Sequence, residues 1–246
     1  MKKYGLIGHP LSHSFSQRYF SEKFKSENIR DSIFSNYDIP HINQIKDLLN
    51  NNKELIGLSV TIPHKQSILP FLDYSDKAVL EIGACNSVRI SENKLYGYNT
   101  DQAGFQKSLQ SKLLPHYKKG LILGTGGSSK AVAYVLKKMG IAYYFVSRRS
   151  SDSTNIIKYS SLTNELINDH KLIINCTPVG MFPNIQDCPE IPYEFITPKH
   201  FLFDLTYNPE ETLFLKKGKD KGAVIKNGYD MLIYQAEASW QIWNEI

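Results

Sequence analysis

Three segments of this chain carry polar residues at positions where a folded protein would usually have apolar ones. One of these segments places a lysine just after the end of an expected strand. The segment Val60-Thr61-Ile62-Pro63 is largely apolar, ends in proline and is followed two residues later by Lys65. Ser14 and Ser16 lie near the N-terminus, and the triplet Asn99-Thr100-Asp101 follows a further extended segment. Hydroxyl, amide and carboxylate groups hydrogen-bond polar ligands, and an amine can also carry a proton. A single lysine after a strand is usually a solvated charge. Whether it belongs to a site depends on whether the expected strands and helices bring the serines, the Asn99-Thr100-Asp101 triplet and Lys65 close together.

The first part of the chain alternates between strand and helix patterns. The expected elements are, in order, a strand at 4–7, a helix at 17–27, a strand at 33–39, a helix at 42–49 and a strand at 55–62. This alternation predicts an open, parallel α/β sheet. Ligands bind beyond the carboxyl ends of parallel strands, so the loop with Ser14 and Ser16 and the segment with Lys65 should share one edge of the sheet.

Asn86 and Asp101 fall in less regular segments. Residues 83–88 and 95–101 flank a turn and are expected to form two short strands or extended segments. Aspartate is a favoured N-cap residue, so Asp101 also has a purely structural interpretation as the cap of a helix that begins near Ala103.

A second α/β pattern, with a glycine-rich turn, begins near residue 121. A strand at 121–123 is followed by Gly124-Thr125-Gly126-Gly127-Ser128-Ser129, by a helix that Gly140 closes, and by a strand at 143–146. This is one βαβ unit with its glycines at the first strand-to-helix turn, which is the arrangement of dinucleotide-binding proteins. The glycines alone are weak evidence, but the flanking elements favour a nucleotide site over a structural turn.

The residues after the second strand of this unit distinguish between two cofactors. An NAD site usually has an acidic residue there, which accepts a hydrogen bond from the ribose 2′-hydroxyl. This chain instead has Ser147-Arg148-Arg149, and guanidinium groups can bind a 2′-phosphate bidentately. The sequence therefore predicts NADP, the alternative being that the two arginines only form a solvated corner.

The remaining segments extend this second sheet. The expected elements are a loop at 151–160, a helix at 162–167, strands at 172–177, 201–205 and 223–225, a helix at 211–217 and a long helix at 229–244. The loop at 178–181 follows another strand end of the same sheet, so we expect it to lie near the nicotinamide.

Composition excludes several classes of protein. The chain has 246 residues, a net charge of +5 and 41% hydrophobic residues, which suits an ordinary globular protein of one or two domains. Dense Lys/Arg clusters interleaved with aromatic residues are absent from the sequence, so nucleic-acid binding is not expected. The three cysteines have neither CxxC nor zinc-ligand spacing, so we expect reduced thiols and no metal site. With neither a signal peptide nor a 20-residue apolar stretch, a cytoplasmic protein without a membrane partner is expected.

Together these motifs resemble the shikimate dehydrogenase family. The similarity extends over nearly the whole chain in the same order, through segments 14–16, 60–65, 83–87, 99–101, 124–129, 147–149, 175–181 and 229–235. Members of this family reduce 3-dehydroshikimate to shikimate with NADPH, on the pathway to chorismate and the aromatic amino acids. The resemblance implies an N-terminal open α/β substrate domain, residues 1–101 completed by 228–246. It also implies a Rossmann-type NADP-binding domain at 102–227.

The resemblance also implies roles for individual residues. Lys65 and Asp101 resemble the catalytic pair of the family, and Ser14 and Ser16 the pair that holds the substrate carboxylate. The implied substrate-binding residues are Ser14, Ser16, Thr61, Lys65, Asn86, Asp101, Tyr207 and Gln235. The implied cofactor-binding residues are Gly124, Gly126, Gly127, Ser128, Ser147, Arg148, Arg149, Thr177 and Gly228.

Reduction of a ring ketone needs a hydride at carbon and a proton at oxygen, and the protein must supply the proton. Lys65 can donate it if partial burial favours the neutral amine, whereas Asp101 favours the ammonium form and is expected to orient Lys65 and bind a hydroxyl. Two alternatives stay open. One is a quinate/shikimate dehydrogenase with broader substrate and cofactor use, and the other is an inactive NADP-binding regulatory homologue. The expected partners are small-molecule substrates, in a monomer or homodimer.

Overall fold

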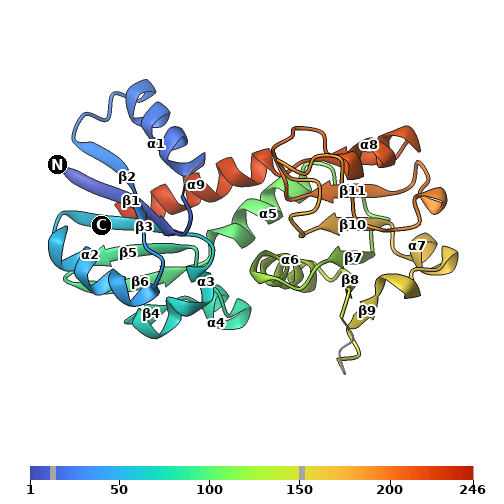
Figure 1. Cartoon of the computed structure of the whole chain (residues 1–246), viewed down its shortest axis with the longest axis horizontal. Helices are drawn as coiled ribbons and strands as arrows, with labels where there is room; N and C mark the ends of the chain where they lie inside the picture. Colours follow the sequence, from blue (N-terminus) through green and yellow to red (C-terminus); the bar gives the residue numbers. More distant parts are fainter. Residues whose placement is uncertain (12–14, 150–152, 246) are drawn as a thin grey trace. The chain divides into compact units, whose positions relative to one another are not determined.

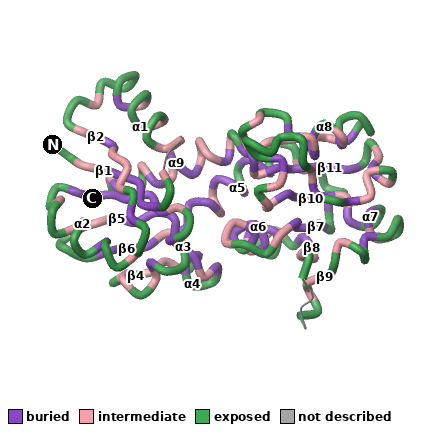
Figure 2. The backbone as a smooth tube through the Cα atoms, in the orientation of Figure 1, coloured by how far each residue is buried: buried purple, intermediate pink, exposed green. Residues whose placement is uncertain are grey.

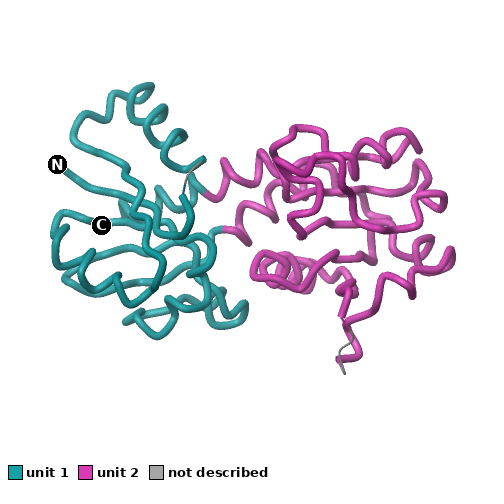
Figure 3. The backbone as a smooth tube through the Cα atoms, in the orientation of Figure 1, with its two compact units in different colours: residues 1–100, 236–246 teal, residues 101–235 magenta. Residues whose placement is uncertain are grey.

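The computed structural model describes residues 1–11, 15–149 and 153–245, and the chain divides into two compact units (Figures 1 and 3). Unit 1 comprises Met1–Thr100 and Ala236–Ile246, and unit 2 comprises Asp101–Gln235. The chain therefore passes from one unit to the other twice. These divisions differ from the expected ranges mainly in the C-terminal helix, whose first residues belong to unit 2 because Met231 packs in the core of that unit.

Unit 1 contains a mixed six-stranded sheet in the order β2-β1-β3-β5-β6-β4. Its elements are β1 (Lys2–Gly8), α1 (Phe15–Ser26), β2 (Ser32–Asp38), α2 (Ile45–Asn51), β3 (Leu55–Val60), α3 (His64–Ser67), β4 (Tyr74–Ser75), α4 (Lys77–Ile82), β5 (Ser87–Ser91) and β6 (Lys94–Tyr98). Short 3₁₀ turns lie at Ile42–Gln44 and Leu69–Phe71. Strands β1, β2 and β3 are parallel, as expected, whereas the β5–β6 hairpin joins β3 in antiparallel fashion.

Alternating side chains of the unit 1 sheet fill two separate cores. Figure 2 marks the buried residues along its strands in purple. On one face, Ile7 and Val60 pack with Ile45 of α2 and Val79 of α4. On the other face the cluster is largely aromatic, and its buried members are Tyr4, Leu6, Phe20, Phe24, Phe34, Ala236 and Trp243. Successive strand residues point to opposite faces, so a buried run such as β1 serves both cores.

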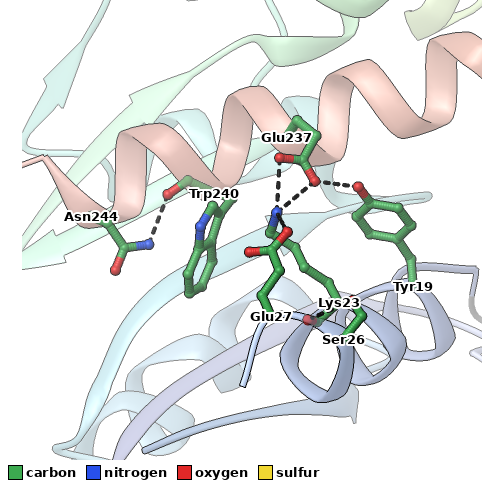
Figure 4. A network of polar contacts seen from close by, with 7 residues as sticks. All are labelled: Tyr19, Lys23, Ser26, Glu27, Glu237, Trp240 and Asn244. Atoms are coloured by element: carbon green, nitrogen blue, oxygen red, sulfur yellow. Dashed lines mark hydrogen bonds and ion pairs between the residues drawn. The ribbon is translucent and has the colours of Figure 1, made fainter. Parts of the chain in front are cut away.

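The C-terminal part of α9 (Tyr229–Asn244) closes the aromatic core of unit 1. A Cβ on Gly57 of β3 would clash with the ring of Trp243, so this helix approaches the sheet closely. Glu237 of α9 accepts hydrogen bonds from Tyr19 and from Lys23, both on α1 (Figure 4). The Lys23 ammonium also pairs with Glu27 at 2.7 Å and lies 5.9 Å from the Trp240 ring centroid. Helix α1 is thereby fixed to α9 by buried aromatic contacts and by a partly buried ion-pair network.

Unit 2 contains a fully parallel six-stranded sheet in the order β12-β11-β10-β7-β8-β9. Its elements are α5 (Thr100–Gln110), β7 (Lys119–Leu123), α6 (Gly127–Lys138), β8 (Ala142–Ser147), β9 (Ile156–Lys158), α7 (Asn164–Asp169), β10 (Leu172–Asn175), β11 (Phe201–Asp204), α8 (Leu213–Asp220), β12 (Val224–Lys226) and the first half of α9. Further 3₁₀ turns lie at Tyr159–Ser161 and Tyr193–Phe195. One face of this sheet packs against α5, α6 and Met231, and the other against α7 and α8. Among the described residues, the helices are all too short or too polar to cross a membrane.

Three sequence-based expectations for unit 2 need correction. The segment at 151–160, expected to be a loop, contains strand β9, while residues 150–152 lie outside the described part of the chain. Helix α7 begins at Asn164 and not at 162, because the side chain of Thr163 accepts a hydrogen bond from the N–H of Leu166 and so caps the helix. Helix α8 begins at 213 and not at 211 because Thr212 caps it in the same way.

Candidate active site

A cavity of unit 2 lies beyond the carboxyl ends of β7, β8 and β10 and has a volume of about 900 Å³. Six of the predicted cofactor-binding residues line it: Gly124, Gly126, Ser147, Arg148, Arg149 and Thr177. In a parallel sheet this edge is where ligands bind, so the structure brings the predicted residues together where the topology expects them.

The glycine-rich turn provides an anion cradle at one end of helix α6. Gly124 has a φ of +99°, a conformation that favours glycine, and a Cβ there would lie 2.9 Å from the Thr177 side chain. Gly126 is the N-cap residue, and its own lack of a side chain leaves the first N–H groups of the helix without a side-chain cap. A Cβ on Gly126 or Gly127 would meet open space, which a ligand can occupy. Exposed N–H groups and the helix dipole together favour a bound phosphate group.

Two arginines mark one end of the cavity. Arg148 and Arg149 follow β8, line the cavity and are exposed, and the N–H of Arg149 donates to Ser147 Oγ at 3.1 Å. Thr177 follows β10, which pairs with β7 on the side opposite to β8. A dinucleotide whose pyrophosphate lies at the glycine turn after β7 would therefore place its 2′-phosphate near the arginines and its nicotinamide half near Thr177. The residues present fit NADP.

Three predicted cofactor residues are not part of the cavity lining within the described chain. Gly127 and Ser128 begin helix α6 directly after Gly126. Gly228 lies elsewhere in unit 2, where its N–H donates to the carbonyl of Thr206 at 3.1 Å. A Cβ on Gly228 would clash with the Leu205 carbonyl, so this glycine permits a close backbone approach.

Sequence reasoning missed one wall of the cavity. Tyr159 and the segment at 186–190 line it together with the glycine turn, and they include Cys188. Burial raises the pKa of Tyr159 to about 12, so its phenol stays protonated at neutral pH. No periodic pattern marks this segment. The one signal in the sequence was Gly180, which precedes this segment and indicates a sharp turn. Its φ is +90°, and a Cβ there would lie 2.9 Å from the Asp187 carbonyl.

In unit 1, the predicted proton donor Lys65 lies on the four-residue helix α3, which a three-residue segment separates from β3. Its side chain is half-buried, and its carbonyl accepts a hydrogen bond of 2.7 Å from the N–H of Cys85. The preceding His64 is buried, and its Nε2 contacts the Ile39 carbonyl at 2.6 Å. The backbone around Lys65 is thus held from both sides.

Asn86, the residue after Cys85, fixes the start of helix α5. Its Oδ1 accepts from the N–H of Thr100 at 2.6 Å, its Nδ2 donates to Thr100 Oγ1 at 2.9 Å, and that hydroxyl lies 2.9 Å from Ser239 Oγ. The expectation that Asp101 caps a helix beginning near 103 is therefore wrong. The helix begins at Thr100, where Asn86 supplies the hydrogen bond to the first N–H, and Asp101 is buried in the first turn.

Asp101 and Gln235 lie on two helices that cross closely within unit 2. A Cβ on Gly104 of α5 would lie 2.6 Å from the Met231 carbonyl and 3.0 Å from Cβ of Gln235 on α9. Residues three apart share a helix face, so Asp101 lies on the face of α5 that meets α9. Tyr207 is half-buried in the loop after β11.

The other predicted substrate residues belong to unit 1. Ser16 is half-buried in the first turn of α1, and Ser14 lies outside the described residues. Thr61 follows β3, where its N–H donates to the Ile7 carbonyl at 2.9 Å, and a side chain on Gly8 would clash with it.

Unit 2 is a Rossmann-type dinucleotide-binding unit, and unit 1 is an α/β unit with buried polar side chains at the ends of its strands. The chain is thus a two-unit α/β protein of the dinucleotide-binding class. Residues 6–88 match the family model of the shikimate dehydrogenase substrate binding domain. A shikimate dehydrogenase (NADP(+)) of Methanococcus maripaludis is 38% identical over 259 residues, which cover 100% of this chain and 92% of that protein. The chain belongs to the shikimate dehydrogenase family.

Solved structures give the same result. A chorismate mutase/shikimate 5-dehydrogenase fusion protein from Clostridium acetobutylicum is 34% identical, with a TM-score of 0.90 over 100% of this chain and 92% of that chain. A shikimate 5-dehydrogenase from Thermus thermophilus, solved in complex with NADP(H) and shikimate, is 27% identical, with a TM-score of 0.88 over 100% of this chain and 94% of that chain.

Proposed function

We propose that this chain catalyses the reversible, NADPH-dependent reduction of 3-dehydroshikimate to shikimate. The cavity of unit 2 is the observation that carries the proposal, because it combines an open glycine turn with two arginines and no acidic residue at the end of β8. The activities that the relatives' names state support the substrate. In this proposal unit 2 binds the cofactor, and unit 1, with Asp101, Tyr207 and Gln235, binds the substrate.

The proposed cofactor-binding residues bind the negatively charged phosphates of NADP at two places. The N–H groups at the start of α6 bind the pyrophosphate, and the guanidinium groups of Arg148 and Arg149 bind the 2′-phosphate. Bound NADPH supplies a hydride to the carbonyl carbon of the substrate. The segment at 186–190 also lines this cavity.

We infer that Lys65 transfers the proton. As the carbonyl carbon accepts the hydride, the oxygen gains negative charge and takes a proton from the Lys65 ammonium, which leaves a neutral amine that solvent reprotonates. The short helix α3 and the Cys85 hydrogen bond hold the backbone of this residue close to the strand end. The carboxylate of Asp101 accepts from a substrate hydroxyl.

Hydrogen bonds select the substrate. Ser14 and Ser16 bind its carboxylate, with Tyr207 on the same side. The hydroxyl-binding groups are Thr61, Asn86, Asp101 and Gln235. A site that pairs hydroxyls rejects analogues that lack them, because its own buried groups would be left unpaired.

The test is the change in NADPH absorbance when shikimate and NADP⁺ are added, with wild type beside Lys65→Ala. We expect Lys65→Ala to lower kcat by about 10²–10⁴-fold with little change in KM. Lys77→Ala is the matched control: this exposed lysine of unit 1 forms a 3.8 Å surface pair with Glu81, and its loss should leave kcat unchanged. A near-wild-type kcat for Lys65→Ala would remove this residue from the mechanism.

The same assay separates the alternatives. A quinate/shikimate dehydrogenase would turn over quinate or NADH with kcat/KM similar to that of shikimate and NADPH. An inactive regulatory homologue would bind NADP⁺ and show no turnover. We further propose a cytoplasmic monomer or homodimer, and sedimentation of the purified chain would test its oligomeric state.

A further inference from the structure

A carboxylate at the end of β11 has no part in the proposed reaction and is nevertheless fully buried. Asp204 is the last residue of β11, and its exposed fraction is 0%. Its partners among the described residues are neutral: the N–H of Thr206 at 2.9 Å, Asn175 Nδ2 at 3.1 Å and Thr212 Oγ1 at 2.6 Å. Burying an ionisable carboxylate without a cation is unfavourable, so retaining one here calls for an explanation.

The carboxylate helps to fix the orientation of a neighbouring amide, together with the Val179 carbonyl, which accepts from Asn175 Nδ2 at 3.4 Å. Asn175 ends β10 and pairs directly with Asp204 across the parallel strands. A carboxylate can only accept hydrogen bonds, so it must face the NH₂ group of Asn175. The oxygen of this amide consequently points the other way, and it accepts from the N–H of Thr177 at 3.0 Å and from Thr177 Oγ1 at 2.6 Å.

This arrangement determines what the Thr177 hydroxyl can do in the cavity. Its single proton is donated to Asn175 Oδ1, and its oxygen accepts from the N–H of Val179 at 3.3 Å. The hydroxyl therefore presents an acceptor to the cavity that Thr177 lines. If the Asn175 amide turned over, its NH₂ would face Thr177, and the hydroxyl would present its proton to the cavity instead.

We infer that Asp204 is a positioning residue for the nicotinamide half of the cofactor, and that it acts through Asn175 to make Thr177 an acceptor for an N–H or O–H of that half. This inference rests on the proposed NADP site. The loop after β11, which carries Tyr207, is held by the same carboxylate through Thr206, so Asp204 organises two neighbouring strand ends.

The test compares two ligands in the complete chain by titration calorimetry. NADP⁺ occupies the whole cavity, whereas adenosine 2′,5′-bisphosphate lacks the nicotinamide half and reaches only the arginine end and the glycine turn. Asp204→Asn keeps the shape but removes the charge that orients Asn175. We expect it to weaken NADP⁺ binding by about tenfold, the loss of one hydrogen bond, and to leave the bisphosphate within about twofold of wild type.

Two further variants separate positioning from simple loss of structure. Thr212→Val removes the hydrogen bond to the other oxygen of Asp204, which does not face Asn175, and should leave the affinity for both ligands unchanged. Thr177→Val should weaken NADP⁺ binding, and adding Asp204→Asn to it should change the affinity by less than about twofold, because the two act in series.

Three results would overturn the inference: wild-type NADP⁺ affinity in Asp204→Asn, an equal loss for both ligands, or fully additive effects with Thr177→Val. If the proposed function itself is wrong, the binding experiment gives a different result. In that case the wild-type chain itself would not bind NADP⁺ or the bisphosphate, whatever stands at position 204.

Discussion

Replacing Asp204 by asparagine should remove one pH-dependent contribution to the stability of unit 2. Burial, partly offset by hydrogen bonds from Thr212, Thr206 and Asn175, raises the pKa of this carboxyl group from 3.8 to about 6. The folded state therefore retains a proton that the unfolded state has lost between about pH 4 and pH 6. The resulting stabilisation is complete below pH 3.8 and is lost as the pH rises through 6.

The size of the effect follows from the two pKa values. A rise from 3.8 to about 6 corresponds to about 3 kcal/mol of unfolding free energy. Two titratable side chains lie close to this carboxylate, the Cys176 thiol and the Tyr193 phenol, and burial raises the pKa of each. Both stay neutral between about pH 4 and pH 8, so Asp204 is the group in this cluster that titrates there.

Urea unfolding at about pH 4, 6 and 8, followed by circular dichroism, measures the difference. Asp204→Asn imitates the protonated side chain, so it should match wild type within about 1 kcal/mol at about pH 4 and exceed its stability by about 2–3 kcal/mol at about pH 8. The two tryptophans of the chain, Trp240 and Trp243, lie in the part of α9 that belongs to unit 1, so their fluorescence reports separately on that unit. A stability difference that does not change with pH would refute the reasoning.

Two other predictions concern single contacts. Gly126→Ala should leave stability within about 1 kcal/mol of wild type, because a φ of −75° suits alanine and its Cβ meets open space, but the added methyl should weaken NADP⁺ binding by at least about tenfold. Thermal unfolding and calorimetry test the two halves of this statement, and unchanged affinity would remove the pyrophosphate from this turn. Lys23→Met should destabilise unit 1 by about 1–3 kcal/mol, seen in tryptophan fluorescence, because it deprives Glu237 of its cation in a partly buried network. Arg18→Met, on the same helix but in an exposed pair with Glu22, should have little effect, and an equal loss there would contradict the explanation.

The sequence was sufficient to predict elements whose residues are buried on both faces. Strands such as β7 and β10 are short apolar runs bounded by turns, so their hydrophobic pattern locates them within about two residues. The glycine turn was equally legible, because Gly124 has a φ of +99° and lies so close to the Thr177 side chain that another residue would disturb it.

Contacts that are distant in sequence could not be predicted. The first N–H of α5 is capped by Asn86, fourteen residues before Thr100, so the local preference of Asp101 for an N-cap gave the wrong helix start. Helix α3 has only four residues, too few for a periodic pattern, although it positions Lys65. The cavity wall at 186–190 contains no regular structure, and only tertiary packing brings it to the glycine turn.

The division of α9 has a consequence for the order in which the chain can fold during synthesis. Unit 2 is one continuous segment, whereas unit 1 needs Ala236–Ile246, which leaves the ribosome after every other part of either unit. Until then the aromatic face formed by Tyr4, Phe20 and Phe24 lacks the Trp243 ring that covers it. Domains usually fold as units, from the N-terminus onward, but here the second unit can be complete while the first still exposes an apolar surface. A ribosome stalled before the end of α9 would thus display a finished nucleotide-binding unit beside an unfinished one that chaperones can recognise.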